Sequence, residues 1–325
     1  MFKNKKANIM DKYIVAASQR MIQQVRHEMD NYRLYNVLRH ILTFLENLTN
    51  WYVRLNRPRM KGDGTKPEDQ LLALNILFDV LLSTTQLISP VTPFLSEHIY
   101  QNMRNGLADG SPLKAESIHF TAIPDYSDAL IDQKTEDMVA RMQDAIETGR
   151  FVRDQVNVSM KYPLQKVKLV DADPAVLKGY QTLERYIKEE LHCLEIDYDK
   201  DEDAYIQYTV VAENRACGQK FGKKFNATFK EALTALTNDQ IKGYLASGKI
   251  MIGDCEVVEG MLKVQKQFRD SVVGDASWGQ QASDKGANVM LDIAMTPELK
   301  GLGQSREITN RIQRLRKTSG ISIED

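Results

Sequence analysis

The sequence contains few cysteines and no arrangement of them that suggests cross-linking. Its 325 residues include Cys193, Cys217 and Cys255, an odd number that stand far apart and form no CxxC pair. This pattern argues against a disulfide framework and against a cysteine-rich zinc site. We therefore expect a reducing, cytosolic compartment.

The motifs that carry nucleotide or hydrolytic chemistry are also missing. The chain has no GxSxG, no GxxxxGK[ST] and no GxGxxG, so the hydrolase, nucleoside-triphosphatase and dinucleotide-binding classes have no support. Its acidic run from Asp197 to Asp203 is typical of a solvated turn. The histidines never stand at a metal-ligand spacing such as HxxxH; they are His27, His40, His98, His119 and His192. We expect neither a catalytic site nor a metal site.

Long hydrophobic runs are absent as well. The longest one, from Leu71 to Leu82, is interrupted by Asn75 and Asp79 and is shorter than the ~20 residues that cross a bilayer. It predicts a core helix and no membrane partner. The charged first residues, 1–6, lack the apolar stretch and cleavage site of a secretory signal.

The composition is that of an ordinary globular protein, and the charge is unevenly distributed. Hydrophobic residues make up 42% and charged residues 27%, and the length fits two or three domains. The net charge of -1 divides into +5 over residues 1–107, +3 over residues 300–325 and -9 between them. Such asymmetry is expected when some domains meet a polyanion and another does not.

Apolar spacing predicts four helices in the first hundred residues. Alternating spacings of four and three place one stripe on the second helix, and Pro58, Gly62 and Gly64 are expected to end it. The third helix, about 68–88, is apolar nearly all round and should be the most buried, and Thr92-Pro93 starts the fourth. We expect Leu45 and Leu77 in the core. The stripes are Ile14, Met21, Val25, Met29 and Tyr32 on the first helix, and Leu34, Leu38, Ile41, Leu45, Leu48, Tyr52 and Leu55 on the second.

The remainder alternates between helix and strand patterns. After a loop over about 107–127, a helix is expected to carry Met138, Met142, Ile146 and Val152. Further helices are expected over 175–191 and 296–320, strands over 167–169, 193–198, 205–211 and within 249–268, and a loop over 270–287. The fold class is therefore multidomain, an N-terminal α-helical bundle followed by one or more smaller mixed α/β domains. We place the bundle at residues 1–125 and the α/β region at 126–325, with a further division expected near 212–236.

The richest local constellation runs from Asn50 to Gly62. It places Trp51 one turn before Arg54 and gathers Arg57, Arg59 and Lys61 around Pro58. Guanidinium groups suit phosphates and an aromatic plane suits an unstacked base, which is the combination that reads single-stranded RNA loops. The alternative remains open that Trp51 is a core anchor and that the basic residues favour the helix dipole.

The last helix carries a second candidate. Ile308, Ile312 and Leu315 lie on one stripe and are expected to be buried. Arg311 and Arg314 lie off that stripe, available for a phosphate or an acidic protein surface, although a basic helix face is often only solvated.

Several segments together resemble the isoleucyl-tRNA synthetase family. The segment 50–62 is similar to the end of a helix in the anticodon-binding bundle of class I synthetases, and Ser89 to His98 resembles the proline turn shared by isoleucyl, valyl and leucyl enzymes. The segments that resemble the eukaryotic and archaeal type are 150–164, 296–299 and 311–317, and those that resemble the bundle's entry and second-helix start are 10–13 and 30–35. Their joint occurrence in order covers nearly the whole chain.

The resemblance implies a fold, a partner and a missing part. It implies an anticodon-binding domain for the bundle, tRNA(Ile) as the ligand, and RNA contacts at Trp51, Arg54, Arg57, Arg59 and Lys61, with Arg311 and Arg314 in the tail. Sequences similar to the HIGH and KMSKS signatures are absent, so the ATP- and magnesium-dependent ligation of isoleucine is expected in a catalytic domain that this chain lacks. That domain is a second expected partner, and other synthetases are a third. The C-terminal zinc module of bacterial relatives is also absent, so no cofactor is expected here.

Two other functions stay open. The acidic α/β region fits a structural or protein-interaction module, because an acidic surface repels phosphate. A valyl- or leucyl-type synthetase would share the bundle, and anticodon preference distinguishes it from the isoleucyl type.

Overall fold

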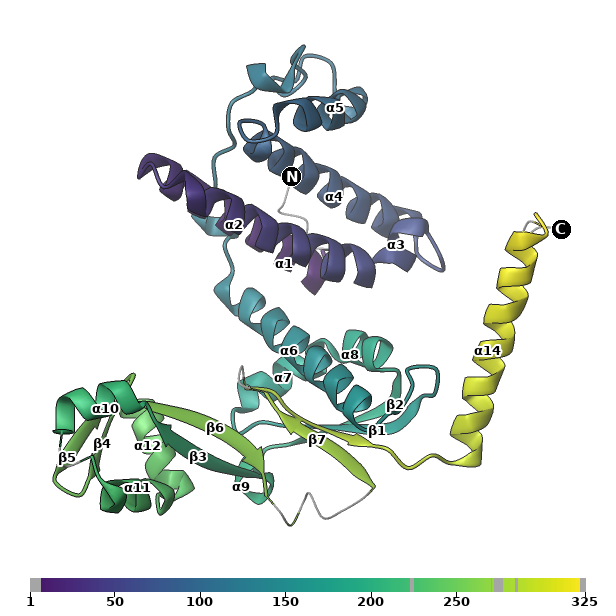
Figure 1. Ribbon diagram of the computed structural model, residues 1–325. Helices are drawn as coiled ribbons and strands as arrows, with labels where there is room; N and C mark the ends of the chain where they lie inside the picture. The colour runs from purple at the N-terminus through teal and green to yellow at the C-terminus, as the bar shows by residue number, and fades with distance from the viewer. Residues whose placement is uncertain (1–6, 223–224, 270, 272–276, 284–285, 322–325) are drawn as a thin grey trace. The chain divides into compact units, whose positions relative to one another are not determined.

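The chain folds into two compact units. The structure is a computed structural model that describes residues 7–222, 225–269, 271, 277–283 and 286–321 (Figure 1). Contacts within the chain separate residues 1–139 from 140–325, whereas the sequence placed the boundary at 125. The boundary falls inside helix α6 (Gln133–Gln155), because Arg20 of the first helix binds both Gln133 and Glu136 in the first turn of α6.

Unit 1 is helical, as the periodicity predicted. Its principal elements are α1 (Ile9–Asp30), α2 (Leu34–Glu46), the π-helix η1 (Asn47–Val53), α3 (Arg57–Lys61), α4 (Pro67–Ile88) and α5 (Pro93–Met103). Three short 3₁₀ turns follow, at η2 (Arg104–Gly106), η3 (Ile118–Phe120) and η4 (Asp128–Leu130). The long helices pack in sequence across the unit, α2 on α1, α1 on α4 and α4 on α5.

Helix α1, rather than α4, is the most buried member of unit 1. Ile14, Met21 and Val25 are buried, as predicted, because α1 lies between α2 and α4. The expectation for α4 was wrong at its first turns, where Leu71 is exposed, and Leu77 is only half-buried. At the other end of the predicted α1 stripe, Tyr32 stands exposed in the turn to α2.

Among the described helices, α4 alone has the length and mean hydropathy to cross a bilayer. One such helix is weak evidence for a membrane protein, since core helices of other proteins share these properties. Packing of α1 and α5 against α4 accounts for part of its apolar character, while Leu71 and Leu74 remain exposed.

The second helix contains a π turn that the sequence analysis missed. Its buried residues are Val37, Ile41, Phe44, Leu48 and Tyr52, so the predicted Leu34 and Leu38 are exposed and Leu45 is half-buried. Phe44, Leu48 and Tyr52 are spaced four residues apart, which is slightly more than one α-helical turn each time. The wider turn of the π-helix η1 accommodates this spacing and keeps the three side chains on one face. Pro58 does not end the helix as predicted; it lies in the first turn of α3.

Unit 2 contains a four-stranded sheet. Its order is β2 (Cys193–Asp199), β1 (Leu164–Val170), β8 (Asn288–Asp292) and β7 (Trp278–Ala282), with β1 and β2 parallel and the other pairs antiparallel. The predicted loop over 270–287 is therefore wrong in part. Strand β7 has the weak strand propensity of Gly279, Gln280 and Gln281, but it lies at the sheet edge, and Gly279 leaves room for Val152 of α6.

Helices pack on this sheet and supply its core. Figure 1 shows α6 and α8 (Glu184–Leu191) over the sheet, with α7 (Pro174–Thr182) beside them. Gly149 of α6 lies against Leu191 of α8 so closely that a Cβ atom would collide with it. The predicted helix over 175–191 divides at Leu183, which is itself fully buried.

A second α/β core occupies the middle of unit 2. Strands β3 (Ile206–Ala212) and β6 (Leu262–Phe268) form one antiparallel pair, and β4 (Lys249–Ile252) and β5 (Cys255–Val258) form another. Helices α10 (Asn214–Phe221), α11 (Ala227–Thr234) and α12 (Asn238–Ser247) pack around Phe229, Val257 and neighbouring apolar residues.

The acidic run from Asp197 to Asp203 is not simply a solvated turn, which corrects that expectation. Glu202 in the short helix α9 (Glu202–Tyr205) is buried and accepts hydrogen bonds from Tyr208, Lys266 and Asn288. These partners come from β3, β6 and β8, so one carboxylate joins the four-stranded sheet to the β3–β6 pair. A buried charge is tolerated there because it is paired and hydrogen-bonded.

The last helix, α14 (Pro297–Thr318), begins where Thr296 caps it, as the sequence predicted. Its first turns pack on unit 2 through Leu299 and Gly303. The expectation that Ile308, Ile312 and Leu315 are buried is wrong, because Ile312, for example, is 59% exposed. The helix contacts the rest of unit 2 through its opposite face.

Candidate nucleic-acid interface

The basic segment after η1 contains one cation that holds the fold. Arg59 is 9% exposed, and its Nε and Nη2 groups donate to both carboxylate oxygens of Asp69 at 2.8 and 2.6 Å. Its Nη1 group donates to Oδ1 of Asp11 at 2.7 Å, and the Tyr52 hydroxyl donates to the same oxygen at 3.0 Å. Arg59 thus joins α1, α3 and α4.

The electrostatics of this cluster fix Arg59 as a charged, internal group. Burial by itself lowers the pKa of the guanidinium, but the hydrogen bonds to Asp11 and Asp69 outweigh it and raise the pKa. Asp11 is fully buried and also caps α1 with Asn8. With its donors engaged inside the unit, Arg59 is unsuited to the RNA contact that the sequence analysis assigned to it, and we remove it from the candidate site.

The inward position of Arg59 turns its neighbours outward. Residues two apart on a helix point in nearly opposite directions, so Arg57 and Lys61 share the exposed face of α3, one turn apart. Gly62 ends the helix in the left-handed conformation, with φ of 81°. Arg54, one turn before Arg57 along the chain, is also exposed. Arg54, Arg57 and Lys61 are therefore three exposed cations close together in the chain, and we call them the basic edge of unit 1.

Trp51 lies within the π turn and is half-buried. Its neighbour Tyr52 is the fully buried aromatic of this turn and is the residue that binds Asp11. Part of Trp51 therefore remains accessible, three positions before Arg54 in the chain. π turns are frequent at functional sites, because the extra residue changes the direction of a side chain without ending the helix.

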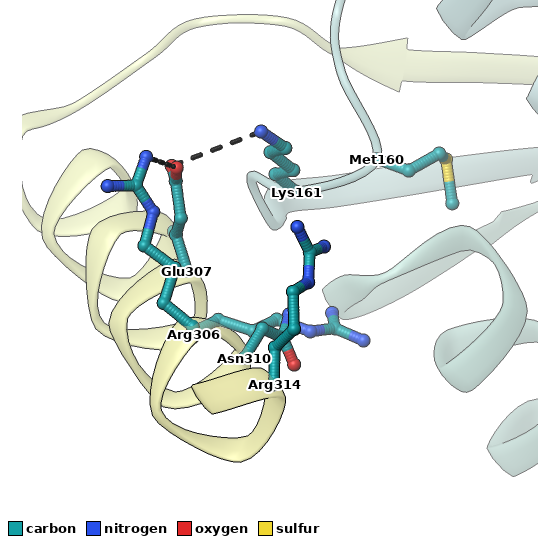
Figure 2. A pocket seen from close by; sticks show the side chains of 8 residues that line it. Met160, Lys161, Arg306, Glu307, Asn310 and Arg314 are labelled. Carbon is teal, nitrogen blue, oxygen red and sulfur yellow. Dashed lines mark hydrogen bonds and ion pairs between the residues drawn. The ribbon is translucent and has the colours of Figure 1, made fainter. Parts of the chain in front are cut away.

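The other two candidates, Arg311 and Arg314, line a groove in unit 2. The groove lies between α14 and the loop before β1 and has a volume of about 510 Å³. It is lined by Met160, Lys161, Gly303, Arg306, Glu307, Asn310, Arg311 and Arg314. Figure 2 shows Lys161 and Arg314 directed into the space between the loop and the helix.

The floor of the groove is organised by a buried arginine. Arg153 of α6 is 2% exposed and donates to the carbonyl oxygens of Ser159 and Tyr162 in the loop, and to those of Leu191 and His192 at the end of α8. Burial lowers the pKa of Arg153 to about 10, which leaves the guanidinium charged at neutral pH.

His192 connects this floor to α14. Its Nδ1 atom lies 3.1 Å from the carbonyl oxygen of Met160 and its Nε2 atom 2.9 Å from Nη1 of Arg306. Since a carbonyl only accepts and an arginine only donates, the ring is neutral with the proton on Nδ1. Burial lowers the pKa of His192, and the charge of Arg306 lowers it further. The ring therefore positions the Arg306 guanidinium at the groove.

From the sequence we proposed Arg311 and Arg314 as candidates but did not include Lys161, Arg306 or Asn310. The signal was present in the spacing, because Arg306, Asn310 and Arg314 recur at intervals of four and so share one helix face. Lys161 is about 150 residues away along the chain from this helix, and only the fold brings it near.

Other chemistry is not evident in the described parts of the chain. Within those residues, no group of three or more metal-binding side chains forms a metal site. Cys193, Cys217 and Cys255 are unpaired and buried.

Comparison with known proteins relates the chain to one enzyme group. Residues 11–168 match the family described as the anticodon-binding domain of tRNA ligase. The chain is 36% identical over 99% of its length to the cytoplasmic isoleucine–tRNA ligase of Saccharomyces cerevisiae and 37% identical over 98% to that of Schizosaccharomyces pombe. It is 36% identical over 97% to the mouse (Mus musculus) cytoplasmic protein. The chain spans 25–30% of the length of these relatives.

Proposed function

The chain belongs to the isoleucine–tRNA ligase family, and we propose that it is the part of such an enzyme that binds tRNA(Ile) at the anticodon stem-loop. The observation that carries the proposal is the basic edge of unit 1, within the matched residues 11–168, where the exposed Arg54, Arg57 and Lys61 follow the half-buried Trp51 closely in the chain. Cations bind the RNA backbone, and an accessible aromatic ring stacks on an unpaired base.

The cations of the basic segment have two different roles, and this difference supports the proposal. Arg59 donates hydrogen bonds to Asp11 and Asp69 and so fixes the position of α3. Arg57 and Lys61 lie on the opposite, exposed face of α3, where they can bind a ligand. Because Arg59 already holds α3 in place, less conformational entropy is lost when Arg57 and Lys61 bind a ligand.

The remaining parts of the enzyme belong to the same proposal. Ligation of isoleucine with ATP and magnesium would take place in a catalytic domain outside this chain, in the cytoplasm, as the names of the yeast and mouse relatives suggest. Docking to that domain is favoured by exposed apolar side chains on the helices of unit 1, including Leu38, Leu42 and Phe94. Other synthetases are further candidate partners. If docking occurs there, Leu38, Leu42 and Phe94 should be less accessible to surface labelling in the full-length enzyme than in this chain.

The test is the selectivity of the chain for anticodon stem-loops. We would measure fluorescence anisotropy with labelled stem-loops of isoleucine, valine and leucine tRNAs under identical salt. The proposal predicts tighter binding of the isoleucine stem-loop. Equal binding of all three would leave only a general affinity for tRNA, and binding of none would refute the function.

A further inference from the structure

We propose that the groove between α14 and the loop before β1 is a second RNA site, which holds a backbone phosphate of the tRNA between Lys161 and Arg314. The inference rests on the proposed function for the nature of the ligand, but it concerns a site in unit 2 that is separate in the chain from the basic edge of unit 1.

The charge of the groove is strongly positive. Lys161, Arg306, Arg311 and Arg314 line it together with a single carboxylate, that of Glu307. Glu307 accepts from Nη2 of Arg311 at 2.6 Å and lies 4.0 Å from Nζ of Lys161, so Arg311 is its main partner (Figure 2). With the neutral His192 at its base, the groove has three positive charges in excess. Gathered like charges are unfavourable in a partly enclosed space, and an anion relieves them.

The orientation of α14 indicates that this positive face is a built feature. Leu299, Gly303, Arg306, Asn310 and Arg314 follow one stripe of the helix, so the residues that anchor its first turns and the residues that line the groove lie on the same face. An amphipathic helix is expected to turn its apolar stripe inward. Here Ile308, Ile312 and Leu315 are exposed on the opposite face, and Arg306, Asn310 and Arg314, although exposed as well, are the residues that line the groove.

Three contacts fix the geometry of the groove without using the proposed phosphate ligands. Gly303 lies against the ring of Tyr162, where a Cβ atom would overlap the ring. His192 accepts from Arg306, and Arg153 holds the loop that carries Lys161. Of the proposed ligands, Lys161 lies on the loop that Arg153 holds, and Arg314 lies on α14 two turns beyond Arg306. In the described part of the chain, Arg314 has no acidic partner.

An RNA phosphate fits this arrangement better than an acidic protein side chain does. Lys161 of the loop and Arg314 of α14 supply donors from the two walls, and a phosphodiester offers two charged oxygens that arginine binds in a fork and lysine binds as a point charge. The electrostatic contribution of such a contact depends on salt, and this dependence provides the readout.

The experiment measures binding of the whole chain to a full-length tRNA transcript with an isoleucine anticodon, at several salt concentrations. Lys161→Ala/Arg314→Ala should weaken binding and reduce the slope of log K against log salt by about 0.7 to 0.9 for one lost phosphate contact. Lys300→Ala is the matched control, because Lys300 is exposed on the same helix but does not line the groove. Glu307→Gln removes the competing carboxylate and should strengthen binding.

The outcomes separate this inference from the proposed function. If the chain binds the tRNA and Arg57→Ala/Lys61→Ala weakens it, while the groove variants match Lys300→Ala, the groove does not hold RNA and only this inference is overturned. An unchanged affinity in Glu307→Gln would count against it in the same way. If the unchanged chain binds no tRNA, both fail. Thermal unfolding of each variant, expected to match the parent, controls for loss of the fold.

Discussion

Arg59 donates from Nη1 to Oδ1 of Asp11 at 2.7 Å, across 48 positions of the chain. This contact separates two roles that look alike in the sequence. Of the four cations between positions 54 and 61, one is internal and holds the N-terminus of α1 to α3, and the other three are exposed. The account of RNA binding depends on that separation.

Loss of Arg59 should destabilise unit 1. Arg59→Met leaves the buried Asp11 without its charged partner, and breaking a buried pair from one side costs about 3 to 5 kcal/mol. The free energy of unfolding in urea measures the effect. Arg57→Met is the matched control and should stay within about 0.5 kcal/mol of the parent, since it changes an exposed position. Similar values for the two variants would show that Arg59 has no special structural role.

The position of the core within the second helix makes a separate prediction. Leu48→Ala should lower the free energy of unfolding by about 2 to 5 kcal/mol, the range for truncating a fully buried leucine. Leu45→Ala should cost less, because Leu45 is half-buried and its truncation leaves a smaller cavity. If Leu45→Ala lowered the free energy of unfolding more than Leu48→Ala does, Leu45 would lie in the core as the heptad spacing predicted, and the π turn would be contradicted.

These corrections show which features the sequence determines locally. The helices of unit 1, the cap at Thr296 and most strands follow from apolar spacing and turn residues, which act over a few positions. The π turn was missed because a regular heptad stripe through Leu45 fits the sequence as well as the observed one through Phe44 does. Strand β7 was missed because its Gly and Gln residues acquire a strand conformation only by pairing with β8.

The candidate site was only partly predictable for a similar reason. Clustering of basic residues identified the segment from Arg54 to Lys61, but it could not reveal that Asp11 and Asp69 would capture Arg59. The groove in unit 2 depends on Lys161 meeting α14, a contact between distant parts of the chain. Helix periodicity correctly placed Ile312 on one stripe with Ile308 and Leu315, but the prediction that this stripe is buried was wrong. Periodicity shows which residues share a face of a helix and does not show which face packs against the protein.

Acidification should loosen the attachment of α14. The folded-state pKa of His192 is lowered, so its contribution to stability is fully present above the unfolded value of about 6.5 and is lost as the pH falls through the folded pKa. A protonated ring can no longer accept from Arg306, and it lies near Arg153, which is also positive.

Hydrogen exchange of the first turns of α14 at pH 7.5 and 5.5 measures this effect. Exchange, corrected for its intrinsic pH dependence, should show less protection at the lower pH. His192→Asn is the control, because asparagine tolerates the left-handed conformation at this position and does not titrate. An equal pH effect in that variant would mean that another group is responsible.

The role of Trp51 can be resolved by separating binding from folding. If its accessible ring stacks on an anticodon base, Trp51→Ala should cost about 1 to 3 kcal/mol of binding energy while the circular dichroism and melting temperature persist. Trp51→Phe, which keeps a smaller ring, should recover part of the affinity. Unfolding of Trp51→Ala would identify the residue as a core anchor instead.

The most direct test of the central claim is the salt dependence of tRNA binding when Arg57 and Lys61 are both replaced by alanine. The account predicts weaker binding of all tRNAs, a slope smaller by about 0.7 to 0.9 for each lost phosphate contact, and little change in selectivity. Arg39→Ala, at an exposed position of α2 away from the basic edge, should leave the slope nearer the parent value. An affinity and a slope that are unchanged in Arg57→Ala/Lys61→Ala would contradict the account, because the basic edge of unit 1 would then not be the RNA surface.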